Sequence, residues 1–405
     1  MNRIHASGRT VDFLVHTGDA CDNAQSNELG WFLDLLDGKT VNPLSGPDDR
    51  PADARPATDL DPYAAFDAQG LYQTGRHGDL PSIPWYTLFG NHDVYAIGIF
   101  PIFEDAAGRR TAPLPLPGRP GWVLPVILDP TASVAYGNVT PAAPGPPRLF
   151  NTPLPVVPNP ARAYFSQPEY IQALFETTTQ PPGSAKLNFA LLQPADARGW
   201  TSVQPVAGLR LIRLDTTDRA QKIPGAFYDQ GALSRAQLTW LRSELEAAAA
   251  SGDLVIVASH HPSASLSSLQ GSAVTPDELR ELLNQYPSVV LHVAGHTHRT
   301  RVTDRSGYIE IETCSTLDLP QEGRLFEIWR NPADASVLVT YEMFSHLDDT
   351  LPPLGDDPLR SLREQARAIA LGDQGAAARQ KLRDPSGADP YGAPSDRKGA
   401  ARLSR

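Results

Sequence analysis

The feature that most constrains this chain is an apolar stretch that runs directly into two histidines. Residues 291–302 read LHVAGHTHRTRV, in which four apolar or near-apolar residues precede Gly295 and the pair His296 and His298. Such a run predicts a buried strand that stops at the glycine. Neutral imidazoles are common ligands of first-row divalent metals, and two of them one residue apart can point to one place. Taken alone, the pair also fits two surface histidines of a loop.

The same pattern recurs at three other places, where an apolar run predicts a strand and polar side chains follow it. The motifs are Gly18-Asp19-Ala20-Cys21-Asp22, Gly90-Asn91-His92-Asp93 and His260-His261-Pro262, after predicted strands at residues 11–17, 81–89 and 254–259. Each motif alone has a plain alternative, since Asp22 fits a helix cap and Gly90-Asn91 fits a turn. Side chains just past the carboxyl ends of strands are nevertheless where open α/β sheets place their sites.

A sheet rich in parallel strands would bring these strand ends to one edge. They offer one carboxylate, one amide oxygen and three imidazoles, from Asp19, Asn91, His260, His296 and His298. Mixed nitrogen and oxygen ligands suit Zn, Mn or Fe better than Mg or Ca. Two metals about 3.5–4 Å apart clamp a phosphoryl group and generate a hydroxide near neutral pH. No Cys, Ser or Lys stands out as a covalent nucleophile, which agrees with attack by a metal-bound hydroxide.

The four motifs, in this order and each after a predicted strand, resemble the successive motifs of the calcineurin-like metallophosphoesterases. The resemblance covers roughly residues 11–315. It implies an α/β fold, an αββα sandwich of two or four layers with long proline-rich insertions, and a binuclear centre. The implied reaction is hydrolysis of a small-molecule phosphomonoester or phosphodiester by attack of a metal-bound hydroxide. The implied cofactors are two divalent or trivalent ions, for which Mn, Fe and Zn all fit.

The resemblance also implies a role for each motif residue. Asp19 would bridge the metals; Asn91, His260 and His296 would bind the second metal, and His298 the first. His92 would be the acid or transition-state contact with Asp93 as its partner, while Asp22 and His261 would support the site from outside the metal ligands. His260 is preferred over His261 as the ligand because the ligand of the family usually stands two residues before the proline.

One departure from the family pattern concerns the first metal. The family opens with Asp-x-His on a first strand, and no Asp-x-His lies upstream of Asp19. A start assigned too late, or a truncation, is the explanation we favour, because the other ligands are intact and a strand missing from a central sheet would be costly. As written the chain is expected to be cytoplasmic, whereas a missing start could hide a signal peptide. The alternative is an impaired or truncated protein of the same fold that acts as a binding protein.

Composition sets the organisation of the 405 residues. We expect a metallophosphoesterase domain at residues 1–355 with irregular insertions at about 37–80 and 101–200. The chain has 39 prolines, nearly twice the usual share of about 5% of residues. They concentrate in particular stretches, which mark the insertions. Residues 356–383 predict a polar helix, and residues 384–405 a disordered tail. The net charge of −11 argues against general nucleic-acid binding, and a nuclease would need a basic track beside the site. No run of about 18 apolar residues predicts a membrane span.

Three helices are predicted between the motifs. Residues 24–36 fit a helix that buries Trp31, Phe32, Leu35 and Leu36. Residues 235–250 fit a second helix, with Ser234 as N-cap and Gln237 completing a capping box, and residues 276–285 a third, with Thr275 and Glu278 in the same roles.

Overall fold

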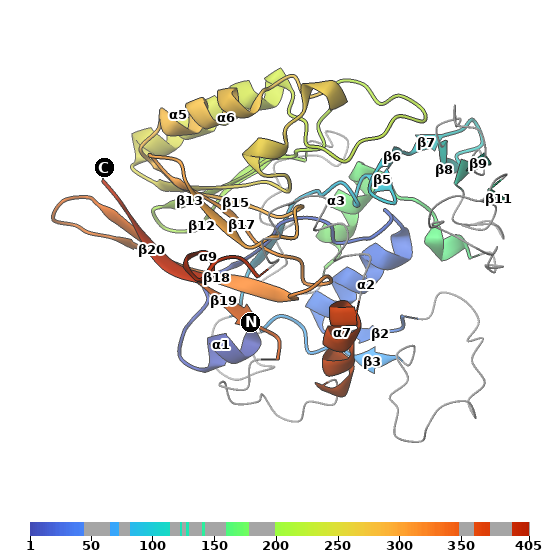
Figure 1. Ribbon diagram of the computed structural model, residues 1–405, viewed down its shortest axis with the longest axis horizontal. Helices are drawn as coiled ribbons and strands as arrows, with labels where there is room; N and C mark the ends of the chain where they lie inside the picture. Colours follow the sequence, from blue (N-terminus) through green and yellow to red (C-terminus); the bar gives the residue numbers. More distant parts are fainter. Residues whose placement is uncertain are drawn as a thin grey trace.

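The predicted α/β class is confirmed by the computed structural model, in which two β layers are packed face to face between helices (Figure 1). The structure describes residues 1–43, 65–72, 82–113, 122–123, 127–128, 140–141, 159–177, 199–347, 360–372 and 391–404. Much of the two expected insertions, at 37–80 and 101–200, lies outside these ranges. None of the described helices is long and apolar enough to cross a bilayer.

The larger β layer is a six-stranded mixed sheet. Its order is β12 (Thr201–Val206), β13 (Leu209–Arg213), β14 (Leu254–Ala258), β15 (Val289–Ala294), β17 (Ile309–Glu312) and β16 (Arg301–Asp304). The four inner strands are parallel, and the two edge strands are antiparallel to their neighbours. The carboxyl ends of β14 and β15, which precede two of the motifs, therefore lie side by side.

The second β layer supplies the other two motifs. β1 (Leu14–His16) and β4 (Trp85–Thr87) form a parallel pair. β18 (Glu322–Arg330), β19 (Val337–Ser345) and β20 (Lys398–Leu403) form an antiparallel sheet. The remaining described strands are short: β2 (Thr40–Val41), β3 (Phe66–Asp67), β5 (Tyr95–Ala96), β6 (Phe100–Pro101), β7 (Phe103–Glu104), β8 (Arg110–Pro113), β9 (Trp122–Val123), β10 (Ile127–Leu128) and β11 (Thr140–Pro141).

The alternation of side chains along the strands builds the layers. Successive residues of a strand point to opposite faces, so Ile212 packs under the helices while its neighbour Leu211 packs between the two β layers. In the second layer Tyr86 lies in the same central core as Leu211, and Trp85 packs on the opposite, helical side. Leu211 and Tyr86 therefore belong to a core between the two β layers, while helices pack on the outer face of the six-stranded sheet and on the outer side of the β1–β4 pair.

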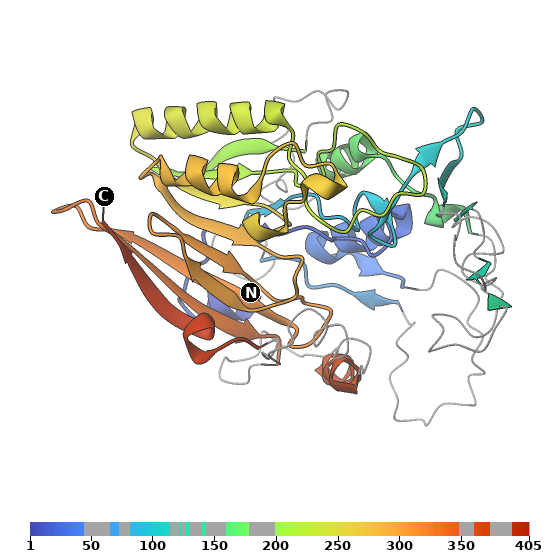
Figure 2. The same cartoon turned by 45° about the horizontal axis from the view of Figure 1, so that its top comes forward.

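Helices cover the two outer faces. α5 (Arg235–Ser251) and α6 (Pro276–Asn284) lie over the six-stranded sheet, and α2 (Ser26–Asp37) and α3 (Gln167–Phe175) cover β1 and β4 (Figure 2). The described helices also include α1 (Asn2–Ala6), α7 (Arg360–Gly372) and α9 (Pro394–Arg397), with 3-10 turns at Pro160–Arg162, Ser263–Ser265 and Ser268–Gln270. Residues 356–359 and 373–383 of the expected C-terminal helix lie outside the described residues.

The predicted helix caps are confirmed in part. Thr275 and Glu278 form the expected capping box of α6. Ser234 caps α5 and accepts the Gln237 backbone N–H, but the side chain of Gln237 does not complete a box; it hydrogen-bonds both the N–H and the C=O of Asp215. A neighbouring strand end with two open backbone groups is thus the better partner for that amide.

The predicted buried face of α2 is wrong in one position. Leu35 is 44% exposed, whereas Leu29, six residues earlier, is buried. Trp31, Phe32 and Leu36 are partly buried. The helix contacts β2 and the 3-10 turn at Pro160–Arg162, and Phe32 packs edge-to-face on Trp85 of β4.

The expected disorder of residues 384–405 is wrong for their described end. Lys398–Leu403 form β20, which pairs with β19 along its whole length. Arg397 adds a two-pronged ion pair with Glu322, with N–O distances of 2.9 and 3.1 Å. The unpaired edge of a strand offers a row of backbone groups that can pair with another segment. The local composition of residues 384–405 does not reveal that β19 offers such an edge.

Burial of Leu403 in the central core makes the role of the tail testable. Leu403 is 8% exposed and packs in the same core as Val337 and Val339. Leu403→Ala should lower the free energy of unfolding by about 2–3 kcal/mol, because it removes buried methyl groups and leaves a cavity. Urea denaturation measures it, with Ala400→Ser on the exposed face of β20 as the control. An unchanged midpoint for Leu403→Ala would mean that the tail does not pack on the sandwich.

Candidate metal centre

Glycines at the strand ends let the motif loops approach one another closely. A Cβ on Gly90 would lie 2.5 Å from the Asp19 backbone nitrogen, and a Cβ on Gly18 would lie 2.6 Å from the Gly90 nitrogen. Real Cβ atoms are not found so near backbone, so larger residues would separate β1 from β4 at this point. The pattern of an apolar strand followed by Gly therefore marks the places where the loops meet.

Four motif side chains that are far apart in the sequence meet at one point. Asn91 Oδ1 lies 2.9 Å from His260 Nε2 and 3.1 Å from His296 Nδ1, and Asp19 Oδ2 lies 3.1 Å from His260 Nε2. The Asn91 amide is turned this way because its Nδ2 donates to the Gly98 carbonyl at 2.9 Å. The predicted ligands Asp19, Asn91, His260 and His296 are thus brought together.

The oxygen atoms around His260 require a positive charge between them and the ring. Its Nδ1 lies 2.7 Å from the Thr17 carbonyl, which can only accept, so Nδ1 carries a hydrogen. Its Nε2 then faces two oxygens that also only accept, those of Asp19 and Asn91. A proton or a metal cation between these three atoms resolves the repulsion, and one carboxylate, one amide oxygen and imidazole nitrogens are a suitable ligand set for Zn, Mn or Fe.

Electrostatics at the site follow from this crowding. Burial would raise the pKa of Asp19, but the charges of His260, His92 and His296 and the hydrogen bond from His260 lower it below its usual range. Burial would lower the pKa of His260, yet the charge of Asp19 raises it overall. Asp19 is therefore an ionised carboxylate, the form that binds a metal.

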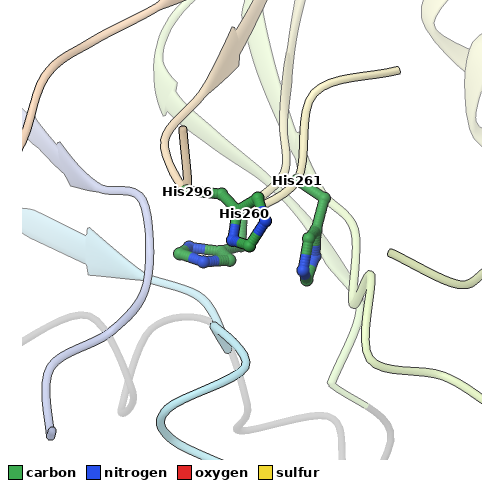
Figure 3. A group of neighbouring side chains, drawn as sticks. All are labelled: His260, His261 and His296. Atoms are coloured by element: carbon green, nitrogen blue, oxygen red, sulfur yellow. The ribbon is translucent and has the colours of Figure 1, made fainter. Parts of the chain in front are cut away.

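His261 lies next to two of these histidines. The ligand atoms of His260, His261 and His296 lie within 4.8 Å of one another, and Figure 3 shows the three side chains together. His260 and His261 are buried and His296 is partly exposed, so the cluster opens to solvent on the His296 side. Burial, followed by the charges of His296, His260 and Arg219, lowers the pKa of His261 well below its usual value, with the backbone of Asp229 opposing. His261 is therefore a neutral imidazole.

Several motif residues hold left-handed backbone conformations. The φ angles are +57° for Asp19, +65° for His296 and +55° for His298. Left-handed φ values are uncommon outside glycine, and they cluster at functional sites, where the surrounding structure enforces them.

His298 takes a different position from the other histidines. It does not join the three-histidine cluster; its Nδ1 lies 2.7 Å from Asp318 Oδ2, and both side chains are partly exposed. Asp318 lies in the loop after β17, and no motif pointed to it. A carboxylate that holds one ring nitrogen of a histidine is the usual support of a metal-binding imidazole.

The predicted partnership of His92 and Asp93 is wrong. His92 Nδ1 lies 2.6 Å from the Asp22 carbonyl oxygen and 3.5 Å from its carboxylate, so Asp22 orients the ring. Asp93 is buried, and its two oxygens accept the backbone N–H groups of Asp19, Gly90 and Cys21 at 2.8, 2.8 and 3.0 Å. The carboxylate of Asp93 is engaged by the backbone of both loops, and the His92 ring is turned to Asp22 instead.

A buried polar network supports the His260 loop from below, and sequence reasoning missed it. Ser259 Oγ lies 2.7 Å from the His261 carbonyl and 2.8 Å from His292 Nε2. On the other side of the loop, Glu310 accepts both the N–H and the hydroxyl of Ser263 at 2.7 Å. The loop is therefore fixed at both ends. His292 and Glu310 stand within predicted strands, where alternation gives no sign of a polar partner.

The comparisons with known proteins return distant structural neighbours. The chain is similar to a dimetal phosphatase from Danio rerio (16% identity, 46% of this chain and 67% of that chain, TM-score 0.33). It is also similar to GAP50, the anchor in the inner membrane complex of Plasmodium (15%, 52% and 69%, 0.29), and to a putative 5'-nucleotidase from Staphylococcus aureus in complex with alpha-ketoglutarate (16%, 42% and 33%, 0.23). No family model and no curated protein matches the chain.

The three backbone hydrogen bonds of Asp93 generate a prediction. Asp93→Asn keeps the size of the side chain but turns an NH₂ group toward backbone N–H donors, so at least one N–H loses its acceptor. We expect the free energy of unfolding to fall by about 1–3 kcal/mol. Denaturant titration measures the change. Asp22→Asn is the matched control, because the side chain of Asp22 is 74% exposed, and its effect should stay within about 0.5 kcal/mol. Equal stability of the two variants would contradict the role given to Asp93.

Proposed function

We propose that the chain is a metal-dependent phosphoesterase that hydrolyses a phosphomonoester or a phosphodiester. The observation that supports this is the meeting of Asp19, Asn91, His260 and His296, which come from the ends of four strands. His260 Nε2 and the side-chain oxygens of Asp19 and Asn91 face one another. A bound cation would pair with all three atoms at once.

The residues present fit a metal at this point, and they would act as follows. Asp19, Asn91, His260 and His296 would hold the ion, which supplies polarisation of the phosphoryl oxygens and activation of a water as the nucleophile. The P–O bond to the leaving group breaks as the water oxygen bonds to phosphorus. His92 is the group placed to give the leaving oxygen a proton.

The proton on His92 can be assigned from its contacts. Nδ1 faces the Asp22 carbonyl and must donate to it, so a transferable proton is carried at Nε2 by the charged ring. His92 is partly exposed, so the ring can exchange protons with solvent between turnovers.

A second metal is part of the proposal. Asp19 would be shared between the ions, and His298, held by Asp318, would bind the other one. Mn, Fe and Zn all suit the donors. The rival function is a binding protein with one metal, and the observation that favours it is the position of His298 outside the cluster of His260, His261 and His296.

Loss of either Asn91 or His296 should separate the two functions. Asn91→Ala and His296→Ala each remove a donor from the metal, and we expect turnover of p-nitrophenyl phosphate and bis(p-nitrophenyl) phosphate with added Mn²⁺ to fall by at least about a hundredfold. Circular dichroism should show an unchanged fold. Asn331→Ala and His346→Ala are the controls, because both residues lie outside the motifs.

Retained turnover in both site variants would rule out the proposed chemistry at this centre. An inactive wild-type chain that binds one metal per molecule would favour the binding protein instead. Elemental analysis of the purified chain distinguishes the two cases, since close to two equivalents of metal are expected for the binuclear enzyme.

A further inference from the structure

We propose that His261 is itself a metal ligand, so that one ion is held by three imidazoles, those of His260, His261 and His296. The inference rests on the metal centre of the proposed function and adds a donor that the motif resemblance places outside the ligand set. It commits the site to a transition metal, because three imidazoles favour such ions over Mg²⁺ or Ca²⁺.

Geometry is the first support. Among the described residues, His260, His261 and His296 are the group of His, Cys, Asp or Glu side chains whose ligand atoms all lie within 4.8 Å of one another. The ring centres of His261 and His296 are 4.2 Å apart, and those of His260 and His261 are 4.9 Å apart with the rings perpendicular. Figure 3 shows His261 beside the other two rings.

A buried nitrogen without a partner is the second support. His261 is 1% exposed, and among the described residues no group meets its Nε2 at hydrogen-bond distance and angle; the Asp229 backbone acts on the ring without forming such a bond. Buried polar atoms are nearly always hydrogen-bonded, and each exception needs an explanation such as an ion. The opposite nitrogen, Nδ1, lies 2.8 Å from Thr216 Oγ1. When Nδ1–H donates to that hydroxyl, the lone pair of the ring is at Nε2, the arrangement that metal-binding histidines adopt.

The ring is also locked in place, as a ligand position requires. A Cβ on Gly231 would lie 2.8 Å from His261 Cβ, so the backbone of Gly231 closes one side. The His261 backbone N–H donates to Thr216 Oγ1 at 3.2 Å, and the His261 carbonyl accepts from Ser259. With both ends of the residue fixed, the imidazole needs no rearrangement to meet an ion between the three histidines.

A pair of substitutions isolates the nitrogen in question. His261→Asn places an amide where Nδ1 was, which can keep the bond to Thr216 but removes any donor at the Nε2 position. His261→Gln carries an amide oxygen near the Nε2 position. His346→Gln is the control for removal of a histidine outside the cluster. Each variant is titrated with Co²⁺, whose visible absorption reports on the number and geometry of its ligands, and then with Zn²⁺ in competition.

We expect His261→Asn to weaken Co²⁺ binding by about 10–100-fold and to change the visible spectrum, with His261→Gln between Asn and wild type. X-ray absorption of wild-type protein loaded with no more than one equivalent of zinc should show three imidazoles on that ion, a readout that needs no variant to fold. Two imidazoles in wild type, or unchanged Co²⁺ affinity and spectrum in a folded His261→Asn, would overturn the assignment.

The outcomes for the proposed function are separate. Three imidazoles on the metal with no turnover of any phosphoester would keep the ligand assignment and reject the activity. Turnover with only two imidazoles would keep the activity and reject His261 as a ligand.

Discussion

The buried carboxylate of Asp93 is the interaction on which the site depends. It accepts N–H groups from Asp19 and Cys21 in the loop after β1 and from Gly90 in the loop after β4. Without that link the two loops would have unpaired backbone donors in the interior, which is costly. The link holds Asp19 over Gly90, and His92 then donates its backbone N–H to Asp19 Oδ1 at 3.0 Å. One carboxylate thus fixes where two other functional side chains lie.

The opposite half of the site is fixed by a second buried network. Ser259 must donate its only hydroxyl proton to the His261 carbonyl, so the hydrogen between Ser259 and His292 belongs to His292 Nε2. Burial would raise the pKa of Glu310, but His292, the hydrogen bond from Ser263 and the charge of Arg305 lower it overall. These bonds restrain the backbone of the His260-His261 loop from behind, while Asp93 restrains the loops that face it. The side chains of the candidate metal centre lie close together because the loops on both sides of it are held in place.

The fold class and the convergence of the motifs could be predicted because they depend on local rules. Apolar runs that stop at a glycine identify strands, and parallel strands deliver their ends to one edge. The role of Asp93 could not be predicted, because its partners are backbone groups far away in the sequence. The contact of Asp318 with His298 and the strand Lys398–Leu403 could not be predicted for the same reason. Each depends on what another segment leaves unpaired, and local composition contains no information about that.

Strain and repulsion at the centre have a common explanation. Asp19 and His296 hold left-handed backbone conformations, and Asn91 Oδ1 faces two imidazole nitrogens at about hydrogen-bond distance. The left-handed backbone alone costs roughly 1–3 kcal/mol for each strained residue, and the oxygens of Asp19 and Asn91 repel His260 Nε2 whenever that nitrogen carries no hydrogen. A cation that binds the folded state and not the unfolded one offsets such costs in proportion to its affinity. The proposed metal centre would therefore couple the stability of the fold to the affinity for the ion. The side chains of Asp19, Asn91, His260 and His296 stay close together because the two networks behind them prevent the loops from relaxing apart.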